Sequence, residues 1–212
     1  MNNQTLISQK SETESRLSEF RKTASKCLTQ LLVRLLARTS ITPNIITWFG
    51  FLLSLCGAAL IITNYIVAAG IIVLIGGFFD MLDGALARTT GRVTSFGGIL
   101  DSTLDRVSEA VILMGIIVLY TKNGFIPGIF LASAALPITA LVSYIRAKAE
   151  IMDIECKVGV FTRPERIIVL FLGLLFSQIN LIFLAVALGV IILFSSITVG
   201  QRLHYVWQQT KN

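Results

Sequence analysis

The stretch from Asp80 to Asp105, DMLDGALARTTGRVTSFGGILDSTLD, places four acids around a short polar loop between two apolar segments. Asp80 and Asp83 lie three positions apart, and Asp101 and Asp105 lie four apart. Both spacings put the carboxylates of a pair on one face of a helix. Because the loop has only about ten residues, we expect the two helices to be antiparallel neighbours with all four carboxylates at the same depth.

The composition of the 212-residue chain is that of a membrane protein. Hydrophobic residues make up 54% of it and charged residues only 14%, with a mean hydropathy of +0.78, which is too apolar for a soluble domain of this length. Three cysteines that lie singly exclude a disulfide scaffold. The net charge of +6 does not indicate nucleic acid, because most lysines and arginines lie in tails or short loops beside apolar runs. We therefore expect the lipid bilayer as partner surface, and no nucleic acid.

The apolar runs predict an all-α integral membrane protein with six transmembrane helices. Residues 45–63 carry no charge and would form a helix of about 28 Å. Residues 167–200 are also uncharged, but one helix of about 51 Å is too long for a bilayer core of about 30 Å, so we expect a hairpin at residues 177–180. The other predicted spans run from Ile66 to the acids Asp80 and Asp83, from about Phe96 to Tyr120, and over residues 125–145.

Both ends of the chain are predicted to lie on the same side of the membrane. Residues 1–15 are polar and are expected to form a disordered tail, whereas residues 16–38 carry an apolar stripe and basic residues, as in an amphipathic helix in the headgroup layer. Residues 39–212 would form the six-helix domain. Every lysine and arginine except Lys122 then lies on the side of the N-terminus. The positive-inside rule thus places both termini and the acids on the cytoplasmic side of the plasma membrane.

The four acids need compensating charge if they converge beside lipid. Like charges a few ångströms apart repel, and ionisable groups near lipid are rarely unpaired. Divalent cations would supply the charge, and ligands that are all oxygen select hard ions such as Mg²⁺ or Mn²⁺. Gly84, Ala87, Gly97 and Gly98 leave room beside the acids, either for the phosphates of a substrate or simply for tight helix packing.

The acids and small residues together fit the pattern DxxDGxxAR, followed after eight residues by GxxxDxxxD, with Gly97 as the glycine of the last block. This pattern resembles the signature of the CDP-alcohol phosphotransferase family, and the resemblance covers about residues 16–207. Members of that family have six transmembrane helices and an N-terminal interfacial helix, usually form homodimers, and displace CMP from a CDP-linked lipid with an alcohol. The resemblance implies an enzyme of phospholipid biosynthesis.

By motif position, the resemblance implies roles for the four acids. Asp80, Asp83 and Asp101 look like ligands of a site for two Mg²⁺ or Mn²⁺ ions. Asp105 looks like the fourth ligand, which also deprotonates the acceptor hydroxyl as a catalytic base. The positions similar to those that bind the CDP-lipid are Asn44, Ile45, Ile46, Thr47, Asp80, Gly84, Ala87, Arg88 and Thr94.

The acceptor is predicted from three basic helix ends. Positive-inside topology alone would explain them, yet they resemble the branch of the family that makes phosphatidylinositol phosphate. In that branch three basic residues hold the acceptor phosphate, and by position they are Arg146, Arg166 and Arg202. The branch that uses glycerol phosphate typically has a proline and a lysine where this chain has Ser102 and Arg106. The resemblance thus implies transfer of the phosphatidyl group of CDP-diacylglycerol to myo-inositol phosphate, with release of CMP.

Other interpretations stay open. Glycerol phosphate as acceptor would give phosphatidylglycerol phosphate, and the lipid could be an archaeal-type ether lipid. A divalent-cation transporter would also present paired acids, but transport sites lie near the middle of the bilayer, whereas these acids lie near the cytoplasmic helix ends. Glu109, one turn deeper than Asp105, is expected to support the acids through a hydrogen bond or to pair with Arg106.

Overall fold

The computed structural model describes residue 33, residues 42–156 and residues 158–211. The tail predicted at residues 1–15 lies outside this part of the chain, and of the amphipathic helix predicted at residues 16–38 only Val33 is described. These two predictions, and the domain boundary at residue 39, therefore stay predictions.

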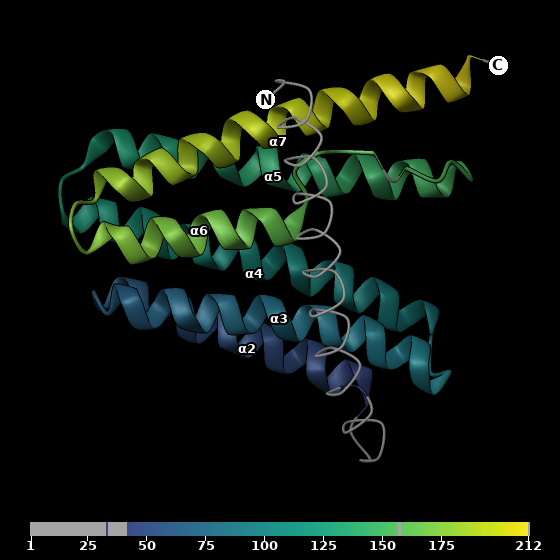
Figure 1. Cartoon of the computed structure of the whole chain (residues 1–212), viewed down its shortest axis with the longest axis horizontal. Coiled ribbons are helices and arrows are strands. Elements are labelled where there is room, and N and C mark those ends of the chain that lie inside the picture. The colour runs from purple at the N-terminus through teal and green to yellow at the C-terminus, as the bar shows by residue number, and fades with distance from the viewer. Residues whose placement is uncertain (1–32, 34–41, 157, 212) are drawn as a thin grey trace, which may run out of the picture.

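The described residues form six helices and no strand, as Figure 1 shows. The prediction of an all-α fold is confirmed. The helices follow the order of the apolar stretches, and the hairpin expected at residues 177–180 separates the last two. Their bounds are α2 (Pro43–Ile62), α3 (Ile66–Thr90), α4 (Ser95–Lys122), α5 (Ile126–Ile151), α6 (Arg163–Ser177) and α7 (Ile182–Thr210).

Four of the described helices, α2, α3, α5 and α7, are long and apolar enough to cross a membrane. The other two differ from them in charge or in length. The first half of α4 carries Asp101, Asp105 and Glu109, and α6 has 15 residues, or about 22 Å. The chain is thus an integral membrane protein in which α4 and α6 lie between the more apolar helices (Figure 1).

The turn between α3 and α4 brings the acid pairs together. After Thr90, Gly91 adopts the left-handed conformation with a φ of 65°, which a residue without a Cβ reaches at low cost. Thr94 then caps α4, because its hydroxyl accepts a hydrogen bond of 3.0 Å from the backbone N–H of Gly97. The connection is therefore only residues 91–94, shorter than expected, because both helices extend into the polar sequence.

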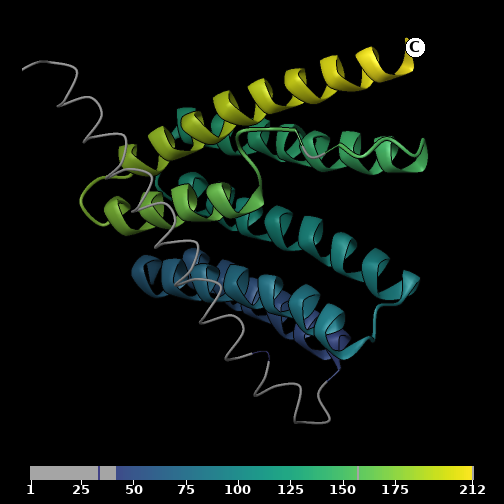
Figure 2. The same ribbon diagram turned by 45° about the vertical axis from the view of Figure 1, so that its right-hand side comes forward.

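The start of α6 is fixed by a capping box. The backbone N–H and the hydroxyl of Thr162 both donate to Glu165 Oε2, at 2.7 and 2.6 Å, and Pro164 lies in the first turn. This cap sets the level at which Arg163 and Arg166 enter the bundle, one helical turn apart. The connection from α5 runs back beside that helix before α6 begins (Figures 1 and 2). α6 therefore starts inside the bundle rather than at its end.

The largest apolar cluster lies toward one end of the bundle, while a smaller one, of Val33, Ile46, Leu82 and Leu86, lies beside the acids. α2 packs against α3 and α4, α5 packs against α4 and α7, and α6 packs against α3 and α7. The core includes Ile61 and Ile66, which flank the α2–α3 turn, together with Leu174 and Leu184 beside the α6–α7 hairpin. At the other end lie the α3–α4 turn, the end of α5 and the C-terminal end of α7 (Figure 2).

The close approach of α2 and α4 depends on Gly115. A Cβ at this position would lie 3.1 Å from the carbonyl oxygen of Ala58 and 3.2 Å from its Cα. Backbone atoms cannot rotate away as the end of a side chain can, so a larger residue would push the helices apart. Small residues at such contacts are typical of membrane helices.

Gly115→Leu should lower the thermal stability of the purified protein in detergent. Overpacking costs about 1–3 kcal/mol, and each kcal/mol lowers Tm by about 2–4 °C in a chain of this size. The matched control is Gly189→Leu in α7, because no described atom of another helix lies within 4 Å of where its Cβ would stand. Melting followed by size-exclusion chromatography measures both variants, and equal Tm values for the two would contradict the tight contact.

Candidate active site

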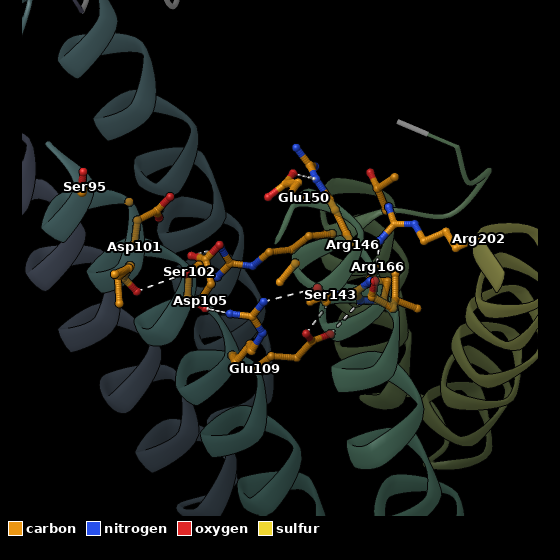
Figure 3. A pocket seen from close by; sticks show the side chains of 17 residues that line it. Ser95, Asp101, Ser102, Asp105, Glu109, Ser143, Arg146, Glu150, Arg166 and Arg202 are labelled. Carbon is orange, nitrogen blue, oxygen red and sulfur yellow. Dashed lines mark hydrogen bonds and ion pairs between the residues drawn. The ribbon is translucent and has the colours of Figure 1, made fainter. Parts of the chain in front are cut away.

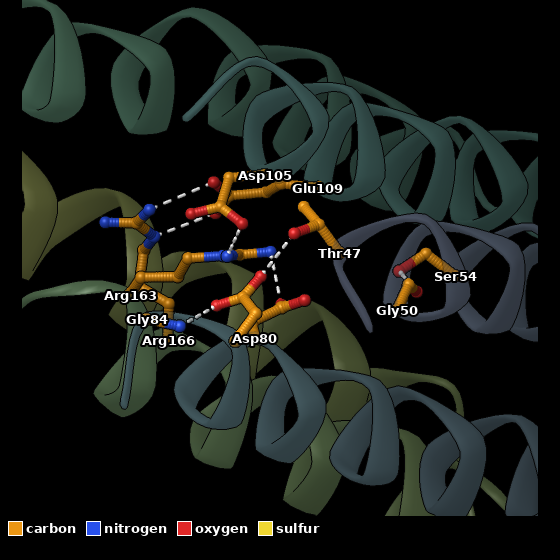
Figure 4. A network of polar contacts seen from close by, with 10 residues as sticks. Thr47, Gly50, Ser54, Asp80, Gly84, Asp105, Glu109, Arg163 and Arg166 are labelled. Atoms are coloured by element: carbon orange, nitrogen blue, oxygen red, sulfur yellow. Dashed lines mark hydrogen bonds and ion pairs between the residues drawn. The ribbon is translucent and has the colours of Figure 1, made fainter. Parts of the chain in front are cut away.

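Two of the predicted acids share a cation that comes from a third helix. Arg163, the first residue of α6, lies between Asp80 on α3 and Asp105 on α4 (Figure 4). Its Nη2 is 2.7 Å from Asp80 Oδ2, and its Nη1 contacts Asp105 Oδ1. The exposed fractions of the Asp80 and Asp105 side chains are only 13% and 26%. A guanidinium group thus neutralises carboxylates from both motif helices.

Asp83 is held by α2 instead. The hydroxyl of Thr47 donates to Asp83 Oδ2 at 2.7 Å, and the backbone N–H of Gly84 donates to Oδ1. Asp83 is buried, with 3% of its surface exposed, and a buried carboxylate needs such donors. Its orientation therefore depends on a residue of α2.

Asp101 lies where two cavities meet. It is one turn before Asp105 on α4, and it lines both cavities together with Gly98. The smaller cavity is bounded by α2, α3 and α4, and the larger by α4, α5, α6 and α7. A group bound at Asp101 would face both spaces.

The smaller cavity, of about 190 Å³, contains most of the residues predicted to bind the CDP-lipid. Those that line it are Asn44, Thr47, Gly84, Ala87, Arg88 and Thr94. The side chains of the neighbouring residues do not: Ile45 is 56% exposed, and Ile46 is buried against Leu82 and Leu86. Successive residues of a helix point to different faces. That Ile45 and Ile46 contact the CDP-lipid therefore stays a prediction. Asp80 also lies outside the lining, at Arg163.

Two glycines leave room for the polar groups. A Cβ at Gly50 on α2 would lie 2.6 Å from Asp80 Oδ1, so the glycine lets this carboxylate approach α2. A Cβ at Gly97 would lie 2.9 Å from Thr94 Oγ1 and 3.2 Å from Asn44 Oδ1. The motif glycine Gly97 therefore allows the starts of α2 and α4 to come together at the smaller cavity.

The larger cavity, of about 540 Å³, is lined by charged side chains of both signs (Figure 3). The structure brings to it all three arginines predicted to hold the acceptor phosphate. Its arginines are Arg106, Arg146, Arg163, Arg166 and Arg202, and its acids are Asp101, Asp105, Glu109 and Glu150.

Two of the predicted arginines have different surroundings. Arg146 forms an exposed pair with Glu150, at 2.9 Å, in which 55% of each side chain is accessible. Such a pair contributes little and leaves the side chain free to move. Arg202 is 4% exposed and donates to the carbonyl oxygen of Val158 at 2.9 Å and to that of Val142. Its position is therefore fixed by backbone.

Glu109 pairs with Arg166 and not, as one expectation had it, with Arg106. Arg166 Nε and Nη2 donate to the two carboxylate oxygens of Glu109, at 2.7 and 2.9 Å. Arg106 donates instead to the carbonyl oxygen of Ser102 and, at 3.4 Å, to that of Ser143. Glu109 does not pair with Arg106 because the Arg106 side chain points toward α5, whereas Glu109 faces α6.

The chain is similar to a known protein family and to solved structures. The sequence model of the CDP-alcohol phosphatidyltransferase family matches residues 40–200. The chain belongs to this family. An archaetidylinositol phosphate synthase of Methanothermobacter thermautotrophicus is 37% identical over 199 residues, which cover 93% of this chain and 97% of that protein.

Two solved structures of a phosphatidylinositol phosphate synthase from Mycobacterium tuberculosis are similar to this CDP-alcohol phosphatidyltransferase. Each has a TM-score of 0.74, 33% sequence identity, and a match that covers 84% of this chain. One has CDP-DAG bound and is covered over 93% of its length. The other is in complex with manganese and citrate and is covered over 88%. The family therefore includes an enzyme with a divalent cation in its structure.

The acids of this CDP-alcohol phosphatidyltransferase have the donor chemistry of a site for a hard divalent ion. Within the described parts of the chain, no group of three or more acids, cysteines or histidines is placed around one point that could hold a metal. Instead Arg163 supplies the positive charge between Asp80 and Asp105. All the donors are carboxylate oxygens, which suit Mg²⁺ or Mn²⁺. The type of donor thus fits such an ion, although in this structure Arg163 takes the place between Asp80 and Asp105.

Sequence reasoning did not assign Arg163 to the site. It took the stretch Arg163–Arg166 as a helix start and singled out only Arg166. The signal is the spacing of three positions, which puts both guanidinium groups on one face of α6. That face is directed at Asp105 and Glu109 of α4.

Arg163→Gln should destabilise this CDP-alcohol phosphatidyltransferase more in EDTA than in Mg²⁺. Without the guanidinium, two poorly solvated carboxylates lose their shared partner, at a cost of about 1–3 kcal/mol, whereas a divalent ion would replace the charge. Melting in EDTA and in MgCl₂ tests this, with Arg163→Lys as the variant that keeps the charge. An equal loss of Tm in both buffers would show that Arg163 matters only for packing.

Proposed function

We propose that this chain transfers the phosphatidyl group of CDP-diacylglycerol to myo-inositol phosphate, releases CMP and forms phosphatidylinositol phosphate. The observation that carries the proposal is the larger cavity, where arginines from four helices surround a space that borders Asp105. Guanidinium groups bind phosphate through charge-assisted hydrogen bonds, so such a cavity suits a phosphorylated acceptor better than a neutral alcohol. The names of the similar synthases support inositol phosphate as that acceptor.

The smaller cavity is the proposed site of the CDP moiety. Thr47, Gly84 and Arg88 line it, and so does Asn44 in the first turn of α2. The lipid chains have a suitable surface nearby, an apolar cavity of about 420 Å³ between α3 and α6. It is lined by Leu74, Ile75, Gly77, Phe78, Met81, Pro164, Ile167 and Ile168. Because Met81 follows Asp80 and Pro164 follows Arg163, the lipid would lie beside the acids.

In the proposed reaction Asp105 takes the proton from the attacking hydroxyl of the acceptor. The hydroxyl oxygen bonds to the phosphorus next to the lipid, and the anhydride bond to CMP breaks. Arg146, Arg166 and Arg202 would hold the acceptor phosphate. Two divalent ions bound by the four acids would polarise the pyrophosphate and balance the charge of the leaving CMP. The contact of Arg163 with Oδ1 of Asp105 would make this carboxylate a weaker base for as long as it lasts.

Ether lipid is the second candidate for the donor. The archaetidylinositol phosphate synthase is similar to this chain over nearly its whole length, whereas the solved relative is described with CDP-DAG. The names of both relatives contain inositol phosphate and differ in the lipid. They therefore support the proposed acceptor more strongly than the proposed lipid chains. Parallel assays with CDP-diacylglycerol and CDP-archaeol distinguish the two donors.

We further propose that the enzyme works as a homodimer in the plasma membrane, with both termini and the acids on the cytoplasmic side. The family resemblance supports the dimer. The positions of the lysines and arginines along the sequence support the orientation.

The acceptor preference is tested by CMP release from purified protein with CDP-diacylglycerol and MgCl₂. We expect inositol phosphate to be the best acceptor, because its phosphate matches the arginine cavity. Free inositol should be poor, and glycerol phosphate should be intermediate. A preference for glycerol phosphate, serine or free inositol would overturn the assignment of the acceptor and leave the family unchanged.

Two motif variants should separate metal binding from base catalysis. Asp101→Asn should lose both CMP release and Mn²⁺ binding, measured by electron paramagnetic resonance, because it removes a charged ligand. Asp105→Asn should still bind CDP-diacylglycerol but lose about 10²- to 10⁴-fold in rate. Asp153→Asn, in the exposed loop after α5, is the control that keeps activity. Full CMP release in excess EDTA would contradict the metal dependence.

A further inference from the structure

The pair of Glu109 and Arg166 is the most completely enclosed ion pair described for the larger cavity. Both oxygens of the carboxylate accept from one edge of the guanidinium group, with distances of 2.7 Å to Nε and 2.9 Å to Nη2. The Arg166 side chain is 3% exposed and that of Glu109 is 20% exposed. By comparison, Arg146 and Glu150 line the same cavity with 55% of each side chain accessible.

The two-point contact fixes the plane of the guanidinium group. A guanidinium group has five N–H donors, and a bidentate carboxylate uses the edge formed by Nε and one Nη. The opposite edge of Arg166, with its Nη1, has no further hydrogen bond to the described residues. Because Arg166 lines the larger cavity, an anion bound there would not have to displace a described partner from Nη1.

We propose that Glu109 is a positioning residue for the acceptor phosphate, acting through Arg166. The proposal rests on the proposed function in one respect, that the acceptor carries a phosphate. Glu109 holds the arginine in the orientation needed for binding, so the entropy of ordering that long side chain is lost on folding and not on binding. Without the carboxylate, a buried cation would turn toward another partner.

The charge of Glu109 argues against a simpler electrostatic role. A carboxylate beside a phosphate site repels the phosphate, so if only net charge mattered its removal would strengthen acceptor binding. Positioning predicts the opposite result for Glu109. Glu150 is the matched comparison for Glu109. It has the same charge and lines the same cavity, but its ion pair with Arg146 is exposed.

The test measures KM for both substrates with the full-length protein at saturating MgCl₂. Glu109→Gln should raise the KM for inositol phosphate by about 10- to 100-fold, while the KM for CDP-diacylglycerol changes less than about threefold. Glu109→Asp keeps the charge and should recover part of the loss. Glu150→Gln should lower the KM for inositol phosphate slightly. A KM for inositol phosphate that is unchanged or lower in Glu109→Gln would overturn the proposal.

A double-mutant cycle shows whether the effect passes through Arg166. Adding Glu109→Gln to Arg166→Gln should change the KM for inositol phosphate no further, because the positioned group is already gone. An independent loss in the double variant would mean that Glu109 does not act through this arginine. If Glu109→Gln fails to fold, Glu109→Asp takes its place in the cycle. It should then raise the KM for inositol phosphate in the wild-type background but not in Arg166→Gln.

A binding measurement separates this inference from the proposed function. Inorganic phosphate should raise the Tm of the wild-type protein and of Glu150→Gln, but not that of Glu109→Gln. This result together with a wild-type enzyme that rejects inositol phosphate would overturn the proposed acceptor and uphold the role of Glu109. Equal protection by phosphate in wild type and Glu109→Gln would overturn the positioning role, whichever acceptor the enzyme uses.

Discussion

The four carboxylates on α3 and α4 lie within a bundle of apolar helices, where water screens their charges only in part. Their repulsion has to be offset by groups from helices that do not carry the motif. Thr47 from α2 donates to Asp83, and Arg163 from α6 contacts both Asp80 and Asp105. The relative positions of α2, α3, α4 and α6 are thus tied to the same charges that a phosphoryl-transfer site requires.

The place where α6 begins meets this requirement. Here the connection after α5 turns back into the bundle, and the capping box of Thr162 and Glu165 starts α6 at the level of the acids. Arg163 and Arg166 then meet the acids of α4 from the first turn. The residues of the cap therefore determine the positions of the Arg163 and Arg166 guanidinium groups.

Features that depend on local patterns were predictable from the sequence, and features that depend on which helix stands opposite were not. Uncharged length predicted the helices and the hairpin at residues 177–180. The acids are closer to residues of α2 and α6 than the short loop alone predicted, because α3 packs against α2 and α6, and α4 against α2 and α5. The partner of Glu109 was missed because Arg166 lies 57 positions away on another helix. The predicted run at residues 44–47 could not tell which side chains line the smaller cavity, because a helix presents only some of its residues to a cavity.

In the larger cavity it is positive charge, that of the arginines, which needs a compensating group. Arg106 and Arg202 donate to backbone carbonyl groups, which bind their protons without cancelling their charge. Among the described residues neither arginine forms an ion pair, and a phosphate group would bring them a negative charge that a neutral acceptor would not. On the proposed function, the phosphate also offers Arg163 an anionic partner besides Asp105. Acceptor binding would then help to release the carboxylate that takes the proton, so that the base becomes free when its substrate is in place.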